Sequence, residues 1–416
     1  MRLSVNKPAI FKEVYLSVLR DNVTKFGSIW ALKKLMYRGL KEFAWFSLLP
    51  IAVTLHLLQF RQLLIRTEHV GHLAAEFDTL EKLKRLGLLP KYRYFVLAPK
   101  KSASNQHLLT YWSKYFTIFV QPILCGFLSL CSRHFFLRYD VSSFISSFFG
   151  TQEIYQINQL WNSRPPLLAL NDSDEQWSIS VLQDLGIPEH QWFVCLHVRE
   201  GKFWPQNELI QSHRNASITH TFLAIEEIVR RGGIVVRMGD LSMCKLPQLA
   251  GVIDYAHHPL KSERLDVILC AKAKFFLGCT SGLAFVSMIF GVPVAQANMI
   301  PLEALAVGKS DISISKRLWS ESAQRYLSLS EVFTSPASGF YFSHQYKQAG
   351  IRVDENTPED ILALTCEMLD RLDKTFDENE EDRRLHADFM LLLKPGHYSY
   401  GAISKVCLAF LRQYLS

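Results

Sequence analysis

The sequence is poor in charge and lacks the signatures of several enzyme classes. Charged side chains make up only 20% of the 416 residues and hydrophobic ones 49%, which supplies large apolar cores and argues against disorder. There is no GxxxxGK[ST] phosphate loop, no GxGxxG after a strand-like run and no GxSxG. These absences disfavour kinase-like enzymes, dinucleotide-dependent enzymes and hydrolases of the GxSxG type.

The eight cysteines form no CxxC pair and no Cys/His cluster at zinc spacing. Most lie in apolar runs, where a free cysteine behaves as a small hydrophobe, so we expect free thiols in a reducing compartment. Adjacent His257 and His258 have no partner ligands at metal spacing. We therefore expect no metal and no bound cofactor.

The formal charge of +7 is unevenly distributed, because residues 1–42 carry nine Lys/Arg against three acidic residues. Such a basic segment suits an anionic lipid surface better than a nucleic acid, for which the basic patch is expected on the folded domain. We expect a membrane surface as a partner and no nucleic acid. The expected location is cytoplasmic, peripheral or anchored at the inner face of the cell membrane.

Two uncharged runs follow, at 43–60 and 115–132, and no cleavable signal peptide precedes them. The first has the minimum length of a membrane span but contains Pro50, so we interpret it as an in-plane helix or monotopic anchor, with a true span as the alternative. The second contains Pro122 and Gly126, and we predict a buried strand followed by a core helix there.

The chain length predicts two domains of ordinary size. We expect a helical membrane-associating segment over 1–60, an N-terminal α/β domain over 61–190, a C-terminal α/β domain over 191–395 and a C-terminal helix over 396–416. Residues 150–190 are polar and contain several prolines, which is typical of a connection between domains.

The C-terminal domain shows a regular alternation of strand-like and helix-like segments. Strands are predicted at 192–198, 234–238, 275–278 and 292–297, with helices between them and a further helix that begins at Thr357-Pro358. Thr219 and Ser262 are predicted to cap two of the helices. Strands separated by helices predict an α/β fold with parallel sheets covered by helices on both faces.

Polar residues cluster where these strands end. They are His197, Arg199 and Glu200 after the first strand, Arg237, Gly239 and Asp240 after the second, and Cys279, Thr280, Ser281 and Gly282 after the third. Since ligands of such folds bind at the carboxyl ends of the strands, we expect a site there.

The segment Thr280–Gly282 offers hydroxyls, backbone N–H groups and a helix N-terminus to a phosphate, although a plain helix cap explains it equally well in isolation. His197 and Arg199 share one face of the strand end, and Arg199 can bind a phosphate bidentately. Arg214 and Asn215, in a polar loop, offer a second contact or a solvated loop. A buried Arg237 needs a partner, either Asp240 or a phosphate.

The segments HVREG (197–201), RNA (214–216), RGGIVVRMGD (231–240) and 251–293 resemble a bacterial family of glycosyltransferases. That family is related to the fucosyltransferase superfamily defined by an H-x-R element, within the GT-B architecture. The specific part covers about 100 residues of the C-terminal domain, and Val70-Gly71-His72-Leu73 is a weaker match to the N-terminal unit.

The resemblance implies two Rossmann-like domains facing a cleft, with a nucleotide-sugar in the C-terminal one and no catalytic metal. It maps Arg199 onto the residue that holds the donor diphosphate, Asp240 onto an acidic group near the nucleoside, and Thr280–Gly282 onto the phosphate-facing turn. HVREGKF lacks the second basic residue and the acid that follow in fucosyltransferases, so sugar and base stay open.

We expect a glycosyltransferase that acts on a surface glycan or a lipid-linked acceptor. Cations and helix-end N–H groups stabilise the departing diphosphate. His197, Glu200 and His72 are candidates for the base that activates the acceptor hydroxyl. The alternatives are a non-catalytic protein that binds the nucleotide or sugar, and a membrane-bound interaction protein whose histidines and arginines are structural.

Overall fold

The computed structural model describes residues 32–34, 36–141, 143–146, 151–162, 164–201 and 205–415, so the first half of the predicted 1–60 segment lies outside it. The chain forms two compact units. The smaller comprises Met1–Leu63, Tyr92–Leu97 and Phe119–Tyr139, and the larger Leu64–Lys91, Ala98–Ile118 and Asp140–Ser416. This division differs from the predicted boundary at 190/191, because most of the range 61–190 joins the larger unit.

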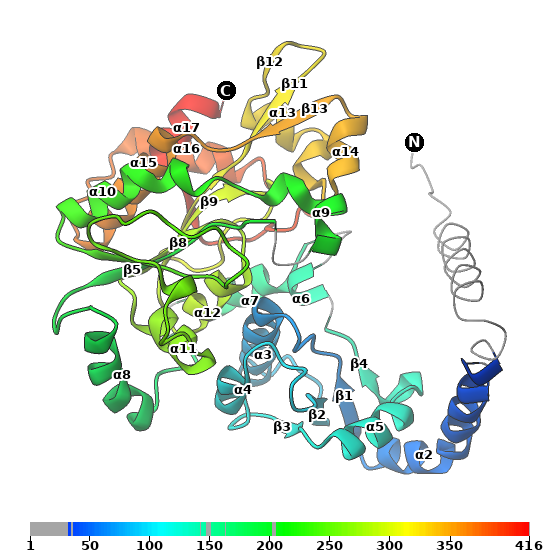
Figure 1. The fold of residues 1–416 in the computed structure, drawn as a ribbon. Coiled ribbons are helices and arrows are strands. Elements are labelled where there is room, and N and C mark those ends of the chain that lie inside the picture. The colour runs from blue at the N-terminus through cyan, green and yellow to red at the C-terminus, as the bar shows by residue number, and fades with distance from the viewer. Residues whose placement is uncertain are drawn as a thin grey trace. The chain divides into compact units, whose positions relative to one another are not determined.

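A seven-stranded sheet organises the larger unit, in the order β14-β10-β9-β8-β5-β6-β7 (Figure 1). Every neighbouring pair is parallel. The strands are β5 (Phe193–His197), β6 (Ile234–Arg237), β7 (Val252–Ile253), β8 (Phe275–Gly278), β9 (Val294–Met299), β10 (Ile312–Ser315) and β14 (Lys405–Val406). All residues of β8 and β9 are buried, as expected for strands covered on both faces.

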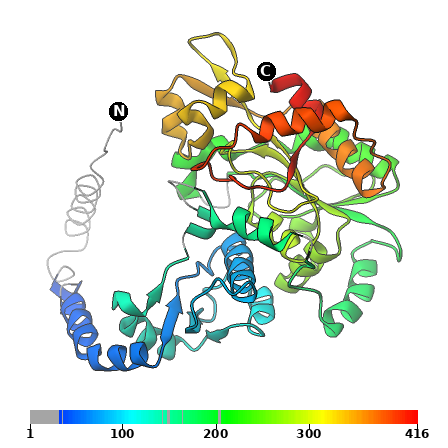
Figure 2. The same ribbon diagram turned by 180° about the vertical axis from the view of Figure 1, so that it is seen from behind.

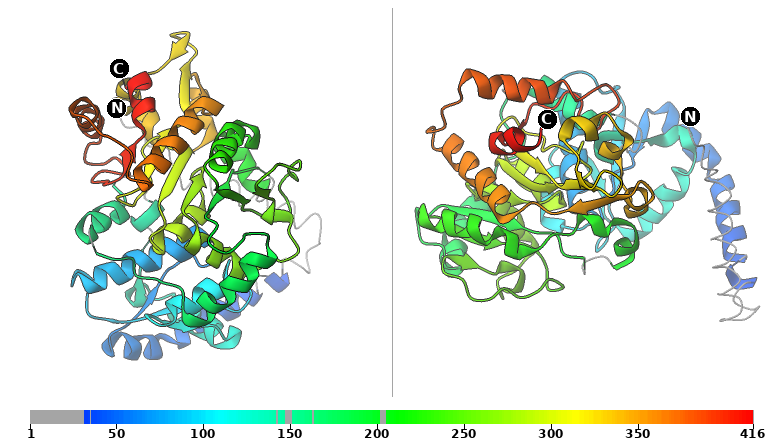
Figure 3. Two further views of the ribbon diagram at one scale, coloured as in Figure 1. Left: turned by 90° about the vertical axis from the view of Figure 1, so that its left-hand side faces the viewer. Right: turned by 90° about the horizontal axis from the view of Figure 1, so that it is seen from above.

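Helices cover both faces of this sheet, which confirms the predicted α/β class. On one face α10 (Phe222–Arg230) packs against α15 (Pro358–Leu372), and these are green and orange helices in Figure 3. On the same side α17 (Leu408–Tyr414) packs against α15 and against α16 (Glu380–Met390) (Figure 2). On the other face α11 (Glu263–Lys272) packs against α12 (Gly282–Ile289), which packs in turn against α3 (Val70–Arg85).

The helix starts follow local sequence, with one exception. Ser262 caps α11 by accepting a bond from the backbone N–H of Leu265, and Thr357 forms a capping box with Asp360 ahead of Pro358. Thr219 does not cap α10, because it lies in a 3₁₀ turn, Ile218–Thr221, that precedes the helix. The C-terminal range 396–416 is only partly helical, since Lys405–Val406 joins the sheet beside β10.

The predicted polar linker at 150–190 is wrong as a description of structure. It contains α7 (Glu153–Trp161), which buries Ile154, Ile157 and Trp161, and α8 (Asp172–Asp184), which is capped by Asn171 and buries Asp174, Ser178 and Val181. The other elements of the larger unit are α4 (Gln106–Trp112), α6 (Ser143–Ser146), α9 (Pro205–Gln211), α13 (Leu329–Phe333), α14 (Ser343–Gln348) and the antiparallel strands β11 (Arg317–Ser320), β12 (Arg325–Tyr326) and β13 (Ile351–Asp354).

The smaller unit has its own parallel pairing, in which β1 (Phe60–Leu63) lies between β2 (Arg93–Leu97) and β4 (Arg138–Tyr139). Its helices are the described residues of Leu32–Ser47, α2 (Leu49–Leu57) and α5 (Pro122–Cys131). The prediction of a buried strand and core helix at 115–132 is wrong, because β3 (Thr117–Phe119) is only partly buried and α5 is largely exposed.

Among the described residues, no single helix has both the length and the hydropathy of a membrane span. The helices Leu32–Ser47 and Leu49–Leu57 reach that length and composition only when taken together, and a bend of 42° separates them.

Candidate functional site

A cavity of about 750 Å³ lies within the larger unit, at the carboxyl ends of β5, β6 and β8. Residues from both predicted domains line it, since its wall includes 68–72 and 104–105 as well as 197–200 and 280–286. Ten of the thirteen residues predicted for the site line this cavity. They are His72, His197, Arg199, Glu200, Arg214, Gly239, Asp240, Thr280, Ser281 and Gly282.

Two guanidinium groups face the cavity from the segments after β5. Arg199 donates through Nη1 to the carbonyl oxygen of Gln211 at 3.2 Å, and its Nη2 lies 4.0 Å from Oε1 of Glu208. Arg214 donates to Oε1 of Gln211 at 3.0 Å and to the carbonyl oxygen of Thr280 at 3.1 Å. Neutral oxygens thus accept the hydrogen bonds of both side chains, and the carboxylate of Glu208 is a 4.0 Å ion-pair partner of Arg199.

Arg199 and Arg214 bring two positive charges close together in a partly buried region, which disfavours the protonated form of Arg199. Burial lowers the pKa of Arg199 to about 10, and the neighbouring charge of Arg214 contributes in the same direction. Arg199 is still protonated at neutral pH, so an anion that enters the cavity gains attraction from both guanidinium groups. The arrangement suits a phosphate or diphosphate.

Two helix N-termini meet at the same cavity. Gly71 of α3 and Gly282 of α12 touch, because a Cβ on Gly71 would lie 2.8 Å from the Cα of Gly282. Neither N-cap side chain, His69 or Ser281, makes a capping hydrogen bond to its own helix. The Oγ of Ser281 is buried without a partner in the described part of the chain. The positive ends of both helix dipoles are thus available to an anion.

The turn after β6 brings an acidic group to the cavity. Gly239 has φ of +149°, and a Cβ there would lie 2.1 Å from the sulfur of Met243, so the position requires glycine. Asp240 follows and accepts from the backbone N–H of Ser242 at 2.8 Å through Oδ1. Asp240 thus adds a carboxylate to the cavity wall, where it can accept hydrogen bonds from hydroxyl groups of a ligand.

His197 faces the cavity as a neutral imidazole. Burial lowers its pKa to about 4, helped by the positive charges of Arg237 and Arg199, and its Nδ1 is buried without a partner among the described residues. Val198 next to it is buried on the opposite face, as the strand alternation predicted. A neutral ring between two arginines is suited to hydrogen-bond a ligand and is a weak base.

The lowered pKa of His197 predicts a pH-dependent stability. The unfolded state binds the proton near pH 6.5 and the folded state near pH 4, so protonation destabilises the fold as the pH falls through this window. We expect the substitution His197→Gln to reduce the slope of unfolding free energy against pH by at most about 1.4 kcal/mol per pH unit. Urea unfolding between pH 4 and 6.5 measures it, and an unchanged slope would contradict it.

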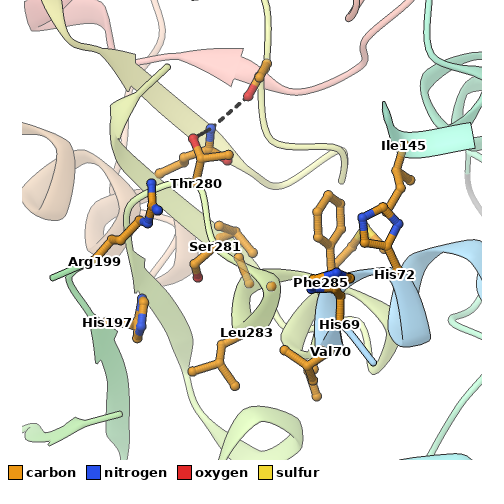
Figure 4. Close-up of a pocket in the computed structure, with 18 of the residues that line it drawn as sticks. His69, Val70, His72, Ile145, His197, Arg199, Thr280, Ser281, Leu283 and Phe285 are labelled. Carbon is orange, nitrogen blue, oxygen red and sulfur yellow. Dashed lines mark hydrogen bonds between the residues drawn. The ribbon is translucent and has the colours of Figure 1, made fainter. Parts of the chain in front are cut away.

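His72 is part of a carboxylate–histidine pair on the first two turns of α3. Its Nδ1 lies 2.6 Å from Oε1 of Glu76, four residues further along the helix. Glu76 is fully buried, and its Oε2 accepts from the backbone N–H of Arg66 at 3.1 Å. The carboxylate thereby fixes the ring and leaves Nε2 for a ligand. In Figure 4, Ser281 lies between Arg199 on one side and His72 on the other.

Apolar side chains line the cavity beside His72, together with His69, whose ring centroid lies 5.6 Å from that of His72. Ile145 and Phe285 lie next to His72 in Figure 4, and Met288, Ile300 and Leu305 continue the wall. The cavity therefore has a cationic portion at Arg199 and Arg214 and an apolar portion beyond His72.

Arg237 does not line the cavity, contrary to the prediction that it contacts the donor. Its guanidinium is bound by Oε1 of Glu200 at 2.8 Å and by Oδ1 of Asp254 at 2.9 Å. The sequence reasoning had assigned Asp240 or a phosphate to this role. β6 pairs with β7 so that Asp254, the residue after β7, comes beside Arg237, and this carboxylate satisfies the buried charge.

Glu200 lines the cavity, but its carboxylate is occupied. One oxygen binds Arg237 and the other accepts from the backbone N–H of Cys244 at 2.7 Å. Because both oxygens already accept hydrogen bonds, Glu200 is a poor candidate for a base. The structure favours His72 for that role among the three residues predicted.

Two further predicted residues lie outside the cavity and bind the segments that line it. The sulfur of Cys279 accepts from the backbone N–H of Arg199 at 2.9 Å, and Asn215 donates to Oε2 of Glu208 at 2.7 Å. Neither side chain lines the cavity. They hold the segments that carry Arg199 and Arg214.

Sequence reasoning missed Glu76 and Gln296. His72 and Glu76 are four residues apart, the spacing of neighbours on one helix face, and this spacing was a usable signal for the first. Gln296 lies inside the apolar strand β9 and donates to the carbonyl oxygen of Ala304 at 2.8 Å, and only the tertiary structure brings it to the cavity. The described residues contain no group of three or more His, Cys, Asp or Glu side chains arranged to hold a metal.

No protein-family model matches the chain, and no curated protein matches it in sequence. Among solved structures, the chain is similar to the E. coli ADP-heptose LPS heptosyltransferase II, with a TM-score of 0.37 and 13% identity over 56% of this chain and 83% of that one. It is also similar to the iron-containing heptosyltransferase TibC of enterotoxigenic E. coli, determined with ADP-D-beta-D-heptose (TM-score 0.33, 14% identity, 69% of this chain and 62% of that one).

The E. coli heptosyltransferase WaaC with ADP is similar at a TM-score of 0.30 and 13% identity, over 62% of this chain and 91% of that one. All of these TM-scores lie below 0.5 and all of the identities below 15%. We therefore base the function of this chain on the geometry of its own cavity.

Proposed function

We propose that the chain is a glycosyltransferase that transfers a sugar from a nucleoside-diphosphate donor to a glycan or a lipid-linked acceptor. The observation that carries the proposal is the pairing of two features in one cavity. Arg199 and Arg214, with the N-termini of α3 and α12, form an anion site, and a carboxylate-supported histidine lies on the other side of Ser281.

The charge of each group in the cavity indicates its role in the transfer reaction. The diphosphate of the donor lies against Arg199, Arg214 and the helix N-termini, which stabilise the negative charge that grows as the bond from the anomeric carbon to the phosphate oxygen breaks. The acceptor hydroxyl attacks that carbon and gives its proton to Nε2 of His72, while Glu76 stabilises the imidazolium. A direct displacement of this kind inverts the anomeric configuration.

Protein groups supply the positive charge in this scheme, so we propose that neither a metal nor a further cofactor takes part. His197 and Asp240 offer neutral and anionic hydrogen-bonding groups to the nucleoside or the sugar. The apolar wall beyond His72, with Ile145 and Phe285, suits an acceptor with an apolar part such as a lipid-linked glycan. We also propose that the segment 1–60 holds the enzyme at the inner face of the cell membrane.

Nucleotide binding tests the proposal. We expect a nucleoside diphosphate from a panel titrated calorimetrically to bind, and Arg199→Ala to weaken that binding about a hundredfold, because charge-assisted bonds to a diphosphate are lost. The melting temperature should change little, since Arg199 makes one hydrogen bond to a carbonyl oxygen and its ion pair with Glu208 is long, at 4.0 Å. Arg230→Ala, on the surface of α10, is the matched control and should bind normally.

Three results would contradict the proposal. Absence of binding by any nucleoside diphosphate or nucleotide-sugar would exclude a transferase of this type. A loss of stability in Arg199→Ala without a change in affinity would favour a structural role for the arginine, as in an interaction protein. Binding without any transfer or hydrolysis of the donor would indicate a non-catalytic nucleotide-binding protein.

A further inference from the structure

Helix α5 of the smaller unit is both apolar and exposed. Its sequence, PILCGFLSLC, contains no charged residue. Ile123 is 90% exposed, Leu124 and Phe127 are about two-fifths exposed, and only the two cysteines are buried. A helix that is apolar all round is normally buried in a core or in lipid, and this one is in no core.

Helix α2, which packs against α5, has the same character. It also lacks charged residues, and it exposes Ile51, Val53 and Leu57 while burying only Ala52. Ala52, Cys131 and Leu137 form the buried centre between these elements. A soluble protein rarely leaves so many large apolar side chains together in water, and a contiguous apolar surface indicates a binding face.

The charge of the smaller unit indicates what this face binds. The described residues of the unit include eight basic side chains, at 33, 34, 38, 41, 61, 93, 133 and 138, and a single acidic one, Glu42. Arg133 binds both oxygens of Glu42, at 2.8 and 2.9 Å. The unit is thus strongly positive, and apolar side chains combined with excess positive charge are typical of proteins that lie on anionic bilayers.

We propose that α5 and α2 together form a lipid-binding face, in which Ile123, Leu124 and Phe127 of α5 enter the interfacial region of an anionic bilayer. At 1.5 Å per residue α5 is about 15 Å long, half of a hydrocarbon core, so it lies in the membrane plane and does not cross it. The inference extends the membrane association in the proposed function from residues 1–60, which include α2, to α5, and it does not require the transfer chemistry.

A second copy of the chain is the other conceivable occupant of an apolar face. Two such units placed face to face would bring their excess positive charges together, and like charges oppose association across an interface. An anionic lipid surface gains from the same charges, at about 1 kcal/mol for each basic residue near the surface. Charge therefore favours lipid.

The experiment compares vesicle binding of the full-length protein with that of the double substitution Ile123→Asp/Phe127→Asp. Vesicles of phosphatidylcholine with 30% phosphatidylglycerol and vesicles of phosphatidylcholine alone serve as probes in a co-sedimentation assay. We expect binding to the anionic vesicles that weakens about a hundredfold in the double variant, since two carboxylates must leave water. Leu391→Asp, at an exposed position of the larger unit, is the matched control and should bind as the natural protein does.

Light scattering and calorimetry separate the remaining outcomes. The substituted side chains are exposed, so we expect the melting temperature and the affinity for nucleoside diphosphate to stay unchanged, which keeps this test independent of the proposed function. Vesicle binding equal in the double variant and the natural protein would overturn the proposal. So would a natural dimer that the double substitution converts to a monomer while vesicle binding persists, because the face would then be a contact between copies.

Discussion

The substitution His72→Ala is expected to lower kcat for sugar transfer about a thousandfold and to leave the affinity for the nucleoside diphosphate within about twofold. A positioned general base contributes roughly two to four orders of magnitude to such a step. The diphosphate is bound by Arg199, Arg214 and the helix N-termini, and none of these contacts involves the imidazole of His72. The donor is the nucleotide-sugar that binds in calorimetry, and turnover is followed by release of the nucleoside diphosphate in the presence of acceptor.

Two companion measurements distinguish a base from a structural residue. Glu76→Gln should reduce kcat by a smaller factor, about tenfold to a hundredfold, because the ring keeps its place but loses the carboxylate that stabilises the imidazolium. Added imidazole should partly restore turnover in His72→Ala. If His72→Ala turns over at the natural rate, the acceptor proton goes elsewhere, and Asp240 becomes the next candidate on the cavity wall.

The substitution Arg237→Met is expected to destabilise the fold by about 3–5 kcal/mol, the usual effect of removing one partner from a buried ion pair. The Arg237 side chain is only 1% exposed, and its removal leaves the carboxylates of Glu200 and Asp254 without a cation. Each carboxylate keeps only a backbone N–H partner, from Cys244 and Leu246 respectively. Urea unfolding at neutral pH measures the change.

The triple substitution Arg237→Met/Glu200→Gln/Asp254→Asn should recover most of that loss, because neutral amides can still accept the two backbone bonds while no charge is left buried. Arg230→Met is the matched control. Arg230 also binds a carboxylate through two nitrogens, at 2.7 Å each to Glu227, but it lies at the surface. Because the exposed pair is screened by water, the loss of Arg230 should leave the free energy of unfolding nearly unchanged. Equal effects of the buried and exposed substitutions would contradict the account.

Four strands of the large sheet, β5, β6, β8 and β9, could be predicted from sequence because they are short continuous apolar runs between clear helix signals, whereas β7, β10 and β14 were not predicted. The run 275–278 coincides with β8, and Ser262 and Thr357 cap the helices as expected. The residues after the strands also meet as predicted, since parallel strands end at one edge. Local pattern and this single topological rule were sufficient.

The partners of charged residues were not predictable in the same way. The sequence suggested Glu200 as a base and Arg237 as a phosphate ligand. The register of β5, β6 and β7 instead pairs their side chains with each other, and Arg237 also with Asp254. The prediction for the run 115–132 was wrong for another reason. An uncharged helix is compatible with a protein core and with a lipid surface, and its sequence alone does not distinguish them.

The smaller unit is built from three separate stretches, 1–63, 92–97 and 119–139, with parts of the larger unit between them. During synthesis the ribosome releases β1 first, but its parallel partner β4 appears only after residue 138. The helix α3, which carries His72 and Glu76, leaves the ribosome within that interval, well before Gly282, against which it packs. The smaller unit therefore has all of its residues once residue 139 has been made, whereas the larger unit needs the rest of the chain. We expect the smaller unit to complete its fold first, while α3 stays without its final partner until α12 has been made.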